Sequence, residues 1–475
     1  MPEVVFLNVV VFGAGYVGLV TGAVMAYIGH EVTLVERKRP VVDVVNAGGS
    51  PIYEPGLESL IADAVSCGTL RATDDPHAVN RADVIFIAVG TPPLASGAPD
   101  LSAVEAAARS IGAHLTTNTQ RPVIINKATV PMGATHLVEV WVTEELRSPD
   151  LWGGSYAVAS NPEFLREGTA VSDTLYPDRI VIGSPWEWAR ERLLTLYRPI
   201  ITGTFHHPAG VPIPRATRPD PVPVVMVDSV SSEMIKYAAN AFLAMKVSFA
   251  NEVARLCELV GADVTAVMAG IGADSRIGEQ FLRAGVGWGG SCFGKDIAAL
   301  LYTGNEYGYK PALLYATQEV NEAQRRHMVE HVRDLLRPVK GRHVAVWGLS
   351  FKPGTDDVRD APARSVIAQL LALGLRVSAF DPVAMDNFRL SYPDLAIRYE
   401  SDPLRCLKGA DALMILTEWP QFKKVDLREI VRHLGRPLLI DGRNIIDPDA
   451  ARRVGLLYRG IGRPDAHLSL AVERP

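Results

Sequence analysis

The sequence predicts an α/β protein with two doubly wound parallel-sheet domains joined by a central helical connector. Short apolar runs rich in β-branched residues alternate with helical patterns near both ends of the chain, as in parallel sheets covered by helices. Between these parts, residues 232–261 carry apolar side chains at helical spacing and contain no proline. We therefore expect three domains, at residues 1–210, 211–326 and 327–475.

Length and composition exclude several classes of protein. A chain of 475 residues is too long for one compact core, and its 48% hydrophobic and 21% charged residues are typical of a globular protein. The net charge of −5 predicts no general attraction to nucleic acid or to an anionic membrane, and no apolar run is long enough to span a bilayer. The four cysteines form no Cys-x-x-Cys pair, so we expect neither a disulfide framework nor a metal site, and a reducing, cytoplasmic location.

The N-terminal strand–turn–helix–strand unit carries the first functional motif. A predicted strand at Val9–Phe12 ends at a Gly-x-Gly-x-x-Gly motif, formed by Gly13, Gly15 and Gly18, and a helical stretch follows. These glycines let the backbone turn tightly and approach a pyrophosphate at the helix N-terminus, so the unit is Rossmann-like.

Glu36 ends the next predicted strand, Val32–Val35. A carboxylate there can accept hydrogen bonds from ribose hydroxyls and would repel a 2′-phosphate, which favours NAD. Arg37 and Lys38 follow directly and leave the use of NADP open.

The rest of the chain continues both patterns. Further strands are predicted at residues 84–89, 123–126, 180–182, 344–347, 376–380, 412–416 and 438–440. The six prolines between Pro208 and Pro223 predict a linker, and the tail after about Gly460 shows little periodicity.

The segment from Gly285 to Asp296 is the most informative in the chain. Five of its first ten residues are glycine, which predicts a loop that can lie close to a ligand. The loop leads to Cys292 at what we expect to be a helix start, where the helix dipole and Lys295 favour the thiolate. Asp296 follows four residues later and could take or relay a proton.

Two pairs of polar residues at i,i+4 spacing are weaker signals. Lys236 and Asn240 share one face of the central helix, and Glu163 pairs with Glu167. Such pairs are most often solvated helix faces, so spacing alone assigns them no chemistry.

Nine motifs in order resemble the UDP-glucose/GDP-mannose dehydrogenase family from about Val9 to Ile445. They are Gly-x-Gly-Tyr-Val-Gly at 13–18, Tyr-Glu-Pro-Gly-Leu at 53–57, Val-Gly-Thr-Pro at 89–92, Lys-Ala-Thr-Val-Pro at 127–131, Asn-Pro-Glu-Phe-Leu-Arg-Glu-Gly at 161–168, Glu-Met-x-Lys-Tyr-x-x-Asn-Ala-Phe at 233–242, Gly-Gly-Ser-Cys at 289–292, Gly-Leu-Ser-Phe-Lys-Pro-Gly-Thr-Asp-Asp at 348–357, and Asp-Gly-Arg-Asn at 441–444. Gly294 departs from the proline common at this position, and the stretch 204–223 looks longer than the family's usual link.

The resemblance implies a two-step, NAD-dependent oxidation of a sugar nucleotide at C6 through a cysteine thiohemiacetal and thioester. The implied catalytic residues are Cys292, Lys236, Asn240, Asp296, Glu163 and Thr129. Cys292 is the implied nucleophile, and Lys236 with Asn240 would stabilise the oxyanion. Asp296 and Thr129 would activate water, and Glu163 would be the base for thioester hydrolysis.

The resemblance also implies the ligand contacts. The NAD contacts are Gly13, Gly15, Tyr16, Val17, Gly18, Glu36, Thr91, Thr129, Glu167, Lys295 and Arg359. The sugar-nucleotide contacts are Phe164, Leu165, Lys236, Asn240, Arg276, Gly289, Phe351, Lys352 and Arg443. Arg276 is the residue expected to enter the site of a neighbouring subunit, so a homodimer or larger homo-oligomer is expected.

Several alternatives stay open. The segment Tyr-Pro-Asp-Arg-Ile-Val-Ile-Gly at 176–183 favours UDP-glucose, while GDP-mannose or a UDP-N-acetylhexosamine would suit the same chemistry. A single-step alcohol dehydrogenase would not need Cys292 in a glycine loop, and a non-catalytic sugar-nucleotide sensor predicts the loss of catalytic groups that are all present here. The oligomer size, feedback control and the pathway served are not readable from the sequence.

Overall fold

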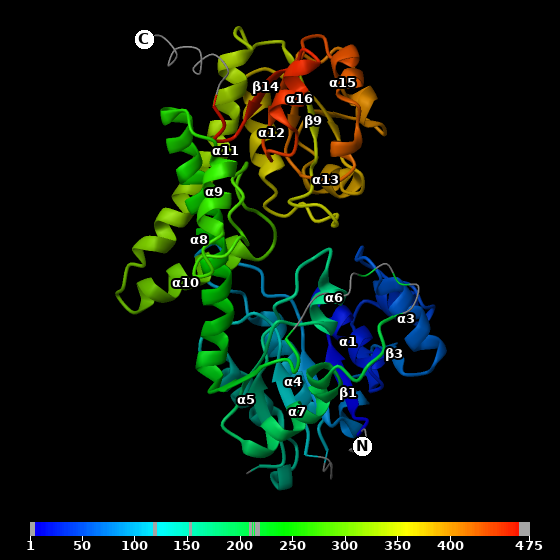
Figure 1. The fold of residues 1–475 in the computed structure, drawn as a ribbon. Coiled ribbons are helices and arrows are strands. Elements are labelled where there is room, and N and C mark those ends of the chain that lie inside the picture. Colours follow the sequence, from blue (N-terminus) through cyan, green and yellow to red (C-terminus); the bar gives the residue numbers. More distant parts are fainter. Residues whose placement is uncertain are drawn as a thin grey trace. The chain divides into compact units, whose positions relative to one another are not determined.

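A computed structural model describes residues 5–116, 121–151, 154–208, 211, 213 and 219–464 of the chain. The chain divides into two compact units, Met1–Ala238 and Ala239–Pro475, and the division falls inside helix α8 (Ser229–Val260). Figure 1 draws both units and labels their elements. No helix in the described part of the chain is both long and apolar enough to cross a membrane.

The first unit is built on an eight-stranded sheet of order β3-β2-β1-β4-β5-β6-β7-β8. Its strands are β1 (Asn8–Phe12), β2 (Glu31–Val35), β3 (Leu70–Thr73), β4 (Val84–Ile87), β5 (Val123–Asn126), β6 (Ala157–Ser160), β7 (Ile180–Gly183) and β8 (Val224–Val227). Neighbouring strands are parallel except for β6 and β7, which meet antiparallel at Ser160 and Gly183. The first six strands follow the doubly wound order 3-2-1-4-5-6, as predicted.

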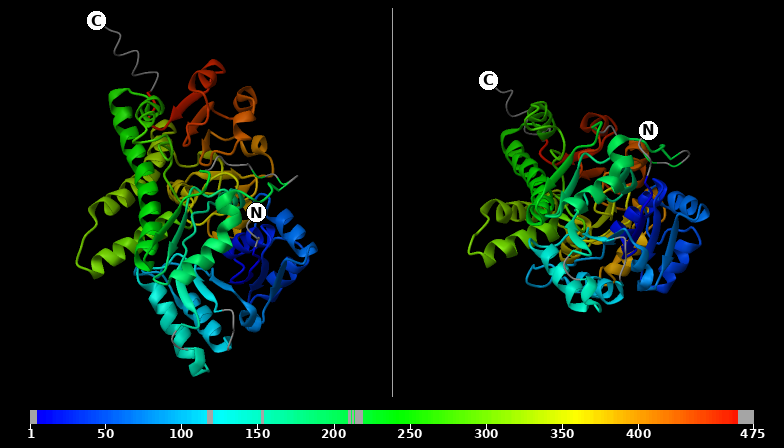
Figure 2. Two further views of the ribbon diagram at one scale, coloured as in Figure 1. Left: turned by 60° about the horizontal axis from the view of Figure 1, so that its bottom comes forward. Right: turned by 90° about the horizontal axis from the view of Figure 1, so that it is seen from below.

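Helices cover both faces of this sheet (Figures 1 and 2). They are α1 (Tyr16–Tyr27), α2 (Arg39–Asn46), α3 (Leu57–Ser66), α4 (Ser102–His114), α5 (Ala134–Glu145), α6 (Ala170–Leu175) and α7 (Glu187–Thr202), with 3-10 turns at Pro76–Arg81 and Pro149–Leu151. Strands β1, β4 and β5 are apolar along nearly their whole length because both faces are buried.

The second unit consists of a helical part followed by another doubly wound sheet. Its helices α9 (Val264–Gly272), α10 (Phe293–Glu306) and α11 (Ala312–Leu335) follow α8. A six-stranded parallel sheet of order β11-β10-β9-β12-β13-β14 comes next, again in the order 3-2-1-4-5-6. Its strands are β9 (His343–Trp347), β10 (Arg376–Phe380), β11 (Ile397–Tyr399), β12 (Ala412–Ile415), β13 (Leu438–Asp441) and β14 (Leu457–Gly460). The covering helices are α12 (Pro362–Ala372), α13 (Met385–Ser391), α14 (Pro403–Cys406), α15 (Leu427–His433) and α16 (Pro448–Arg453), with a 3-10 turn at Phe422–Lys424.

The proline-rich stretch falls partly outside the described residues, at 209–210, 212 and 214–218, and so does the tail at 465–475. Ile213 is buried in the core of the first unit. Its side chain packs against Gly56 so closely that a Cβ on this glycine would clash with it. At this position the segment therefore packs against its own unit.

Candidate active site

The turn between β1 and α1 has the shape that a dinucleotide requires. Gly13 has a φ of +96°, and a Cβ on Gly18 would lie 1.9 Å from the Gly13 carbonyl oxygen, so neither position accepts a side chain. A Cβ on Gly15 would meet no protein atom within 4 Å. Gly15 caps α1 and no side chain caps the helix, so its first N–H groups are available to an anion. The open space and the donors fit a pyrophosphate.

Glu36 is held at the end of β2 by the backbone on both sides. One carboxylate oxygen accepts the N–H of Ala14 at 3.0 Å and the other accepts the N–H of Lys38 at 3.0 Å. Each oxygen keeps further lone pairs for ribose hydroxyls. Arg37 and Lys38 are exposed next to it.

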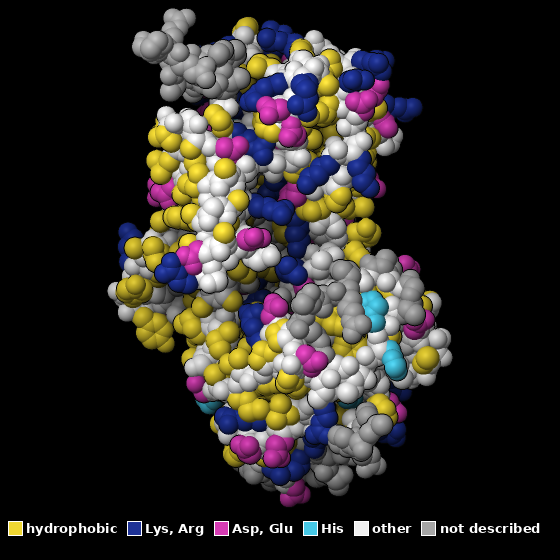
Figure 3. All heavy atoms as spheres, in the orientation of Figure 1, with side chains coloured by type: hydrophobic (Ala, Val, Ile, Leu, Met, Phe, Trp, Pro, Cys, Tyr) yellow, Lys and Arg dark blue, Asp and Glu magenta, His cyan; other side chains and the backbone are white. Residues whose placement is uncertain are grey.

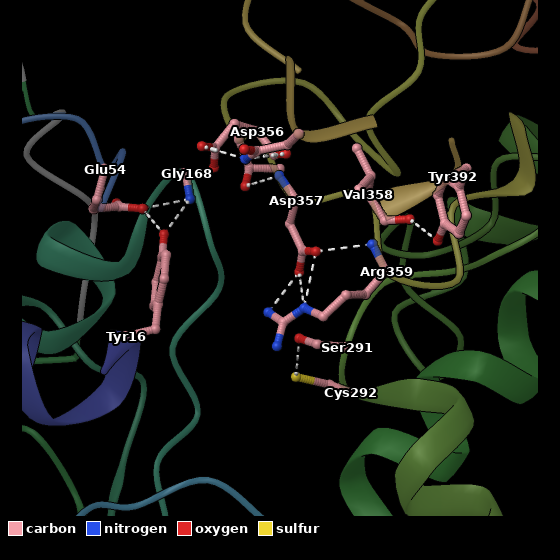
Figure 4. A network of polar contacts seen from close by, with 12 residues as sticks. Tyr16, Glu54, Gly168, Ser291, Cys292, Asp356, Asp357, Val358, Arg359 and Tyr392 are labelled. Atoms are coloured by element: carbon pink, nitrogen blue, oxygen red, sulfur yellow. Dashed lines mark hydrogen bonds and ion pairs between the residues drawn. The ribbon is translucent and has the colours of Figure 1, made fainter. Parts of the chain in front are cut away.

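Tyr16 connects the glycine turn to a residue that our sequence reasoning did not assign. Its hydroxyl donates to the buried carboxylate of Glu54, which also accepts the N–H groups of Gly168 at 2.6 Å and Ala170 at 2.7 Å. Figure 4 shows the Tyr16 hydroxyl pointing at Glu54 and at the Gly168 nitrogen. Glu54 therefore anchors the end of the 161–168 segment beside the start of α1; its place in the 53–57 motif was the available signal.

Two further predicted NAD contacts, Thr91 and Thr129, lie in the loops that follow β4 and β5. Thr91 is buried, and its hydroxyl donates to the Thr129 carbonyl oxygen at 2.8 Å. Thr129 itself is partly exposed, and Val17 packs partly buried against the core from the first turn of α1.

The segment 161–168 is an irregular loop, so the helix face considered for Glu163 and Glu167 is wrong. Both carboxylates are buried. Tertiary contacts, and not helical spacing, determine the conformation of this segment. Glu163 Oε1 lies 2.7 Å from Lys236 Nζ, and both side chains are less than a tenth exposed. Phe164 stacks under Arg179 with 3.7 Å between the guanidinium carbon and the ring centre, while Leu165 packs against the core.

A second buried lysine lies close to this pair and was not predicted. Lys127 Nζ donates to Asn161 Oδ1 at 2.9 Å and to the Tyr197 hydroxyl at 3.3 Å. Burial lowers the pKa of Lys127 to about 8; the Glu163 charge acts in the opposite direction and the Lys236 charge lowers it further. Lys127 begins the 127–131 motif, which was the only sequence signal for it.

In the second unit, the glycine loop is shaped by close contacts. Gly287 has a φ of +102°, and a Cβ there would lie 2.5 Å from Asn321 Oδ1. A Cβ on Gly289 would lie 2.2 Å from the Asp360 carbonyl oxygen, and one on Gly290 would touch the Phe351 ring at 2.7 Å. Gly294 meets ordinary contacts only, so glycine is not sterically required there.

Polar side chains from several elements hold the same loop. The Gly285 N–H donates to Asn251 on α8 at 2.8 Å, and Asn321 on α11 bonds both the N–H and the carbonyl of Trp288. Arg325 reaches the Trp288 carbonyl at 2.8 Å, which completes a rigid frame.

This frame presents Cys292 at the N-terminus of α10, as predicted. Cys292 is exposed, and its Sγ lies 3.5 Å from the Ser291 hydroxyl (Figure 4). An exposed cysteine is unusual, because free cysteine is among the most buried residue types. By contrast, Cys406 is buried, which raises its thiol pKa to about 12.

Asp296 lies one turn along α10 and is fully buried. Its two oxygens accept hydrogen bonds from Asn240 Nδ2 at 2.6 Å and from Lys295 Nζ at 2.7 Å. Asp296 thus orients the Lys295 ammonium. Asn240 lies four residues after Lys236 in α8, and each side chain is oriented by a carboxylate of its own unit.

The predicted sugar-nucleotide residues of this unit surround the same loop. Arg443 donates to the Gly287 carbonyl at 3.4 Å and to the Phe351 carbonyl at 3.2 Å, and Lys352 lies over the Phe351 ring. The predicted NAD contact Arg359 forms a two-pronged pair with Asp357 (Figure 4). Arg276 extends into solvent, with 87% of its side chain exposed.

Each unit therefore contributes a distinct chemical capacity. The first offers an anion-binding helix N-terminus and a buried carboxylate–lysine pair. The second offers an accessible thiol on a rigid loop, a buried carboxylate with two donors, and cationic side chains beside an aromatic ring.

Comparison with known proteins gives a consistent result along the chain. Three models of the UDP-glucose/GDP-mannose dehydrogenase family match: the NAD binding domain at residues 7–201, the central domain at 230–323 and the UDP binding domain at 345–448. The chain is 42% identical over 458 residues to the UDP-glucose 6-dehydrogenase TuaD of Bacillus subtilis, with 96% of this chain and 93% of that protein covered. It is 42% identical over 467 residues to the UDP-glucose 6-dehydrogenase of Pseudomonas aeruginosa, with 97% and 98% covered. The structure of a UDP-glucose dehydrogenase from Pyrobaculum islandicum matches with a TM-score of 0.85 at 38% identity, covering 98% of this chain and 99% of that one.

Proposed function

The chain belongs to the UDP-glucose/GDP-mannose dehydrogenase family, and we propose that it oxidises UDP-glucose at C6 to UDP-glucuronate with NAD as the oxidant. The observation that carries this proposal is the exposed Cys292 at the start of α10, on a loop that side chains from α8 and α11 hold in place. A thiol in this position suits an oxidation that passes through a covalent intermediate. The two relatives at 42% identity are named UDP-glucose 6-dehydrogenases.

NAD supplies the chemistry of hydride acceptance, once for each of the two oxidations. The residues that would hold it are the Gly13–Gly18 turn, Glu36 and Thr91, because Gly15 leaves the space and the α1 N-terminus leaves the donors that a pyrophosphate needs. The other contacts proposed are Tyr16, Val17, Thr129, Glu167, Lys295 and Arg359.

The covalent steps take place on Cys292. Loss of a hydride and a proton from the C6 alcohol yields an aldehyde, and the thiolate adds to the carbonyl carbon to give a thiohemiacetal. Its oxygen carries the negative charge, which the Lys236 ammonium and the Asn240 amide would stabilise. Loss of the second hydride yields a thioester, so the aldehyde is never released.

Hydrolysis ends the cycle. Water adds to the thioester carbonyl, the C–S bond breaks, and the thiolate is restored. Asp296 with Thr129 would orient and activate the water, and Glu163 would take its proton. The pairs Asp296–Asn240 and Glu163–Lys236 keep both carboxylates oriented for this work.

The remaining expectations stand as proposals. Phe164, Leu165, Gly289, Phe351, Lys352 and Arg443 would hold the sugar nucleotide; arginine binds a diphosphate in a two-pronged way and lysine as a point charge. We propose the domains 1–210, 211–326 and 327–475. The low number of cysteines and the lack of a Cys-x-x-Cys pair favour a cytoplasmic location.

We also propose a homodimer that forms through α8. Phe242, Phe249 and Leu256 recur every seven residues along this helix and are each at least half exposed. Figure 3 shows hydrophobic side chains on the surface in the region of α8 and α10. An apolar stripe of this kind marks a protein interface, and Arg276 would then reach the partner's site. A Phe249→Asp chain is expected to elute as a monomer in light-scattering chromatography.

The deciding experiment measures NADH formed per sugar nucleotide consumed, for the wild type and Cys292→Ser. UDP-glucose, GDP-mannose and UDP-N-acetylmannosamine are tested in parallel. We expect a ratio of about two with UDP-glucose, lost in the variant, because both oxidations depend on the covalent intermediate. A ratio of about one, or indifference to Cys292→Ser, would overturn the mechanism. Turnover with another sugar nucleotide alone would overturn the substrate.

A further inference from the structure

Outside the candidate active site, two helices bring a glutamate and two histidines together. Glu258 lies near the end of α8, and His327 and His331 lie four residues apart in α11, so their rings share one side of that helix. One ligand atom from each residue lies within 4.8 Å of the others. Glu258 Oε2 is 2.7 Å from His327 Nε2 and 3.9 Å from His331 Nε2. The three groups converge on one point.

These distances are close to those of a metal site. Zn²⁺ binds imidazole nitrogen and carboxylate oxygen at about 2.0–2.2 Å, which places tetrahedral ligand atoms roughly 3.3 Å apart. The separations of 2.7 and 3.9 Å lie on either side of this value. Side-chain movements of under about 1 Å would admit an ion.

Burial and charge suit a cation. The side chains of His327 and His331 are less than a tenth exposed and that of Glu258 is 15% exposed. Glu258 supplies a carboxylate, and each histidine in its neutral form offers a ring nitrogen that can coordinate a metal.

Neighbouring groups orient two of the three ligands. The Gly462 N–H donates to Glu258 Oε1 at 2.8 Å, and His327 Nδ1 lies 3.1 Å from Glu330 Oε2. Such outer contacts leave Glu258 Oε2 and His327 Nε2 facing the cluster, as metal ligands require. His331 is only 6% exposed, yet its Nδ1 has no hydrogen-bond partner among the described residues.

We propose that Glu258, His327 and His331 bind one divalent transition-metal ion of the zinc class, with water as the fourth ligand. Two imidazoles and one carboxylate favour zinc, whereas Mg²⁺ and Ca²⁺ prefer an all-oxygen set. The ion would join α8 to α11 and, through Gly462, to the chain leaving β14. The cysteine spacing that argues against a zinc site does not bear on this cluster of histidines.

The test uses Co²⁺ as a spectroscopic probe on the full chain after treatment with a chelator. Cys67→Ser and Cys292→Ser are introduced first, because both thiols are exposed and bind such ions themselves. We expect one Co²⁺ per chain with the visible absorption of a four-coordinate site, displaced by Zn²⁺. Zn²⁺, but not Mg²⁺, is expected to raise the Tm.

The matched variant is His331→Phe, which keeps a ring beside His327, whose ring centre is 4.1 Å away, and removes one ligand. We expect its Co²⁺ affinity to fall at least about tenfold while its circular dichroism is unchanged. His77→Ala, on an exposed histidine paired with Asp75, controls for surface binding and is expected to bind like its parent. If His331→Phe misfolds, Glu258→Gln provides the same comparison. Stoichiometric Co²⁺ binding that survives both variants, or no binding by the parent chain, overturns the proposal and leaves a buried ion pair.

Discussion

Asn240 Nδ2 lies 2.6 Å from one oxygen of the buried Asp296 carboxylate, and Lys295 Nζ lies 2.7 Å from the other. Two donors thus fix a carboxylate one helical turn after Cys292. A carboxylate held in this way accepts from both donors, whereas an amide in its place would direct an N–H₂ group at one of them.

Asp296→Asn is therefore expected to impair thioester hydrolysis more than oxidation. A side chain that assists proton transfer typically contributes about 10²–10⁴ in rate, so losing the water-activating carboxylate is expected to lower steady-state turnover within that range. In rapid mixing, we expect a fast burst of NADH followed by slow turnover, and a covalent adduct on Cys292 in the intact mass. A slow single phase without an adduct would assign Asp296 to the oxidation instead.

The buried pair Glu163–Lys236 leads to a prediction about stability. Removing one member of such a pair leaves an uncompensated buried charge, so Lys236→Met is expected to cost about 3–5 kcal/mol of unfolding free energy. Its activity is expected to fall at least about 10²-fold, because an oxyanion donor is lost. Urea unfolding and kcat measure the two effects.

The double variant Lys236→Met/Glu163→Gln separates the two roles. Removing both charges is expected to recover much of the stability without restoring activity. Stability losses that simply add in the double variant would show that the pair is not coupled.

The glycines of the first turn provide a third, internally controlled prediction. A Cβ at Gly15 meets no protein atom, whereas one at Gly18 stands 1.9 Å from the Gly13 carbonyl oxygen. Gly15→Ala is expected to keep its Tm and raise the KM for NAD, because the methyl group occupies the space left for the pyrophosphate. Gly18→Ala is expected to lower the Tm as well. Equal KM values for Gly15→Ala and wild type would contradict this assignment.

Sequence analysis predicted most of the strands that consist of a continuous run of apolar residues. Runs such as β4 and β12 are apolar and buried on both faces, so they were found. Five strands were missed: β3, β6, β8, β11 and β14. Segments such as Ala157–Ser160 and Leu457–Gly460 contain small or charged residues, and only their pairing partners make them strands. Strand β8 is apolar but short, and it directly follows the proline-rich stretch, so composition alone did not identify it.

The same limit applies to the site. Cys292 and Asp296 were found because glycines and one helical turn mark them locally. Sequence analysis did not identify Glu54, Lys127 or Glu258 as site residues, because the residues they contact lie far away in the sequence. Glu258 lies 69 residues from His327, and no spacing rule connects them.

Lys127 carries the fourth prediction, which concerns pH. Its ammonium is buried and bonds to Asn161 and Tyr197, and burial lowers its pKa from 10.5 to about 8. Below pH 8 the residue is charged in both the folded and unfolded chain, so folding bears the cost of burying the charge. Between about pH 8 and 10.5 only the unfolded chain keeps the proton.

The unfolded state therefore binds more protons in this window, and the contribution of Lys127 to stability rises with pH by on the order of 3 kcal/mol. Lys127→Met lacks this rise. We expect the unfolding free energy of the wild type, minus that of the variant, to increase between about pH 8 and 10.5 and to stay level below pH 7. Urea titrations across this range measure the difference and cancel the titration of all other groups. A difference that is flat throughout would mean that Lys127 keeps its ordinary pKa, and that the Glu163 charge offsets the effects of burial and of Lys236.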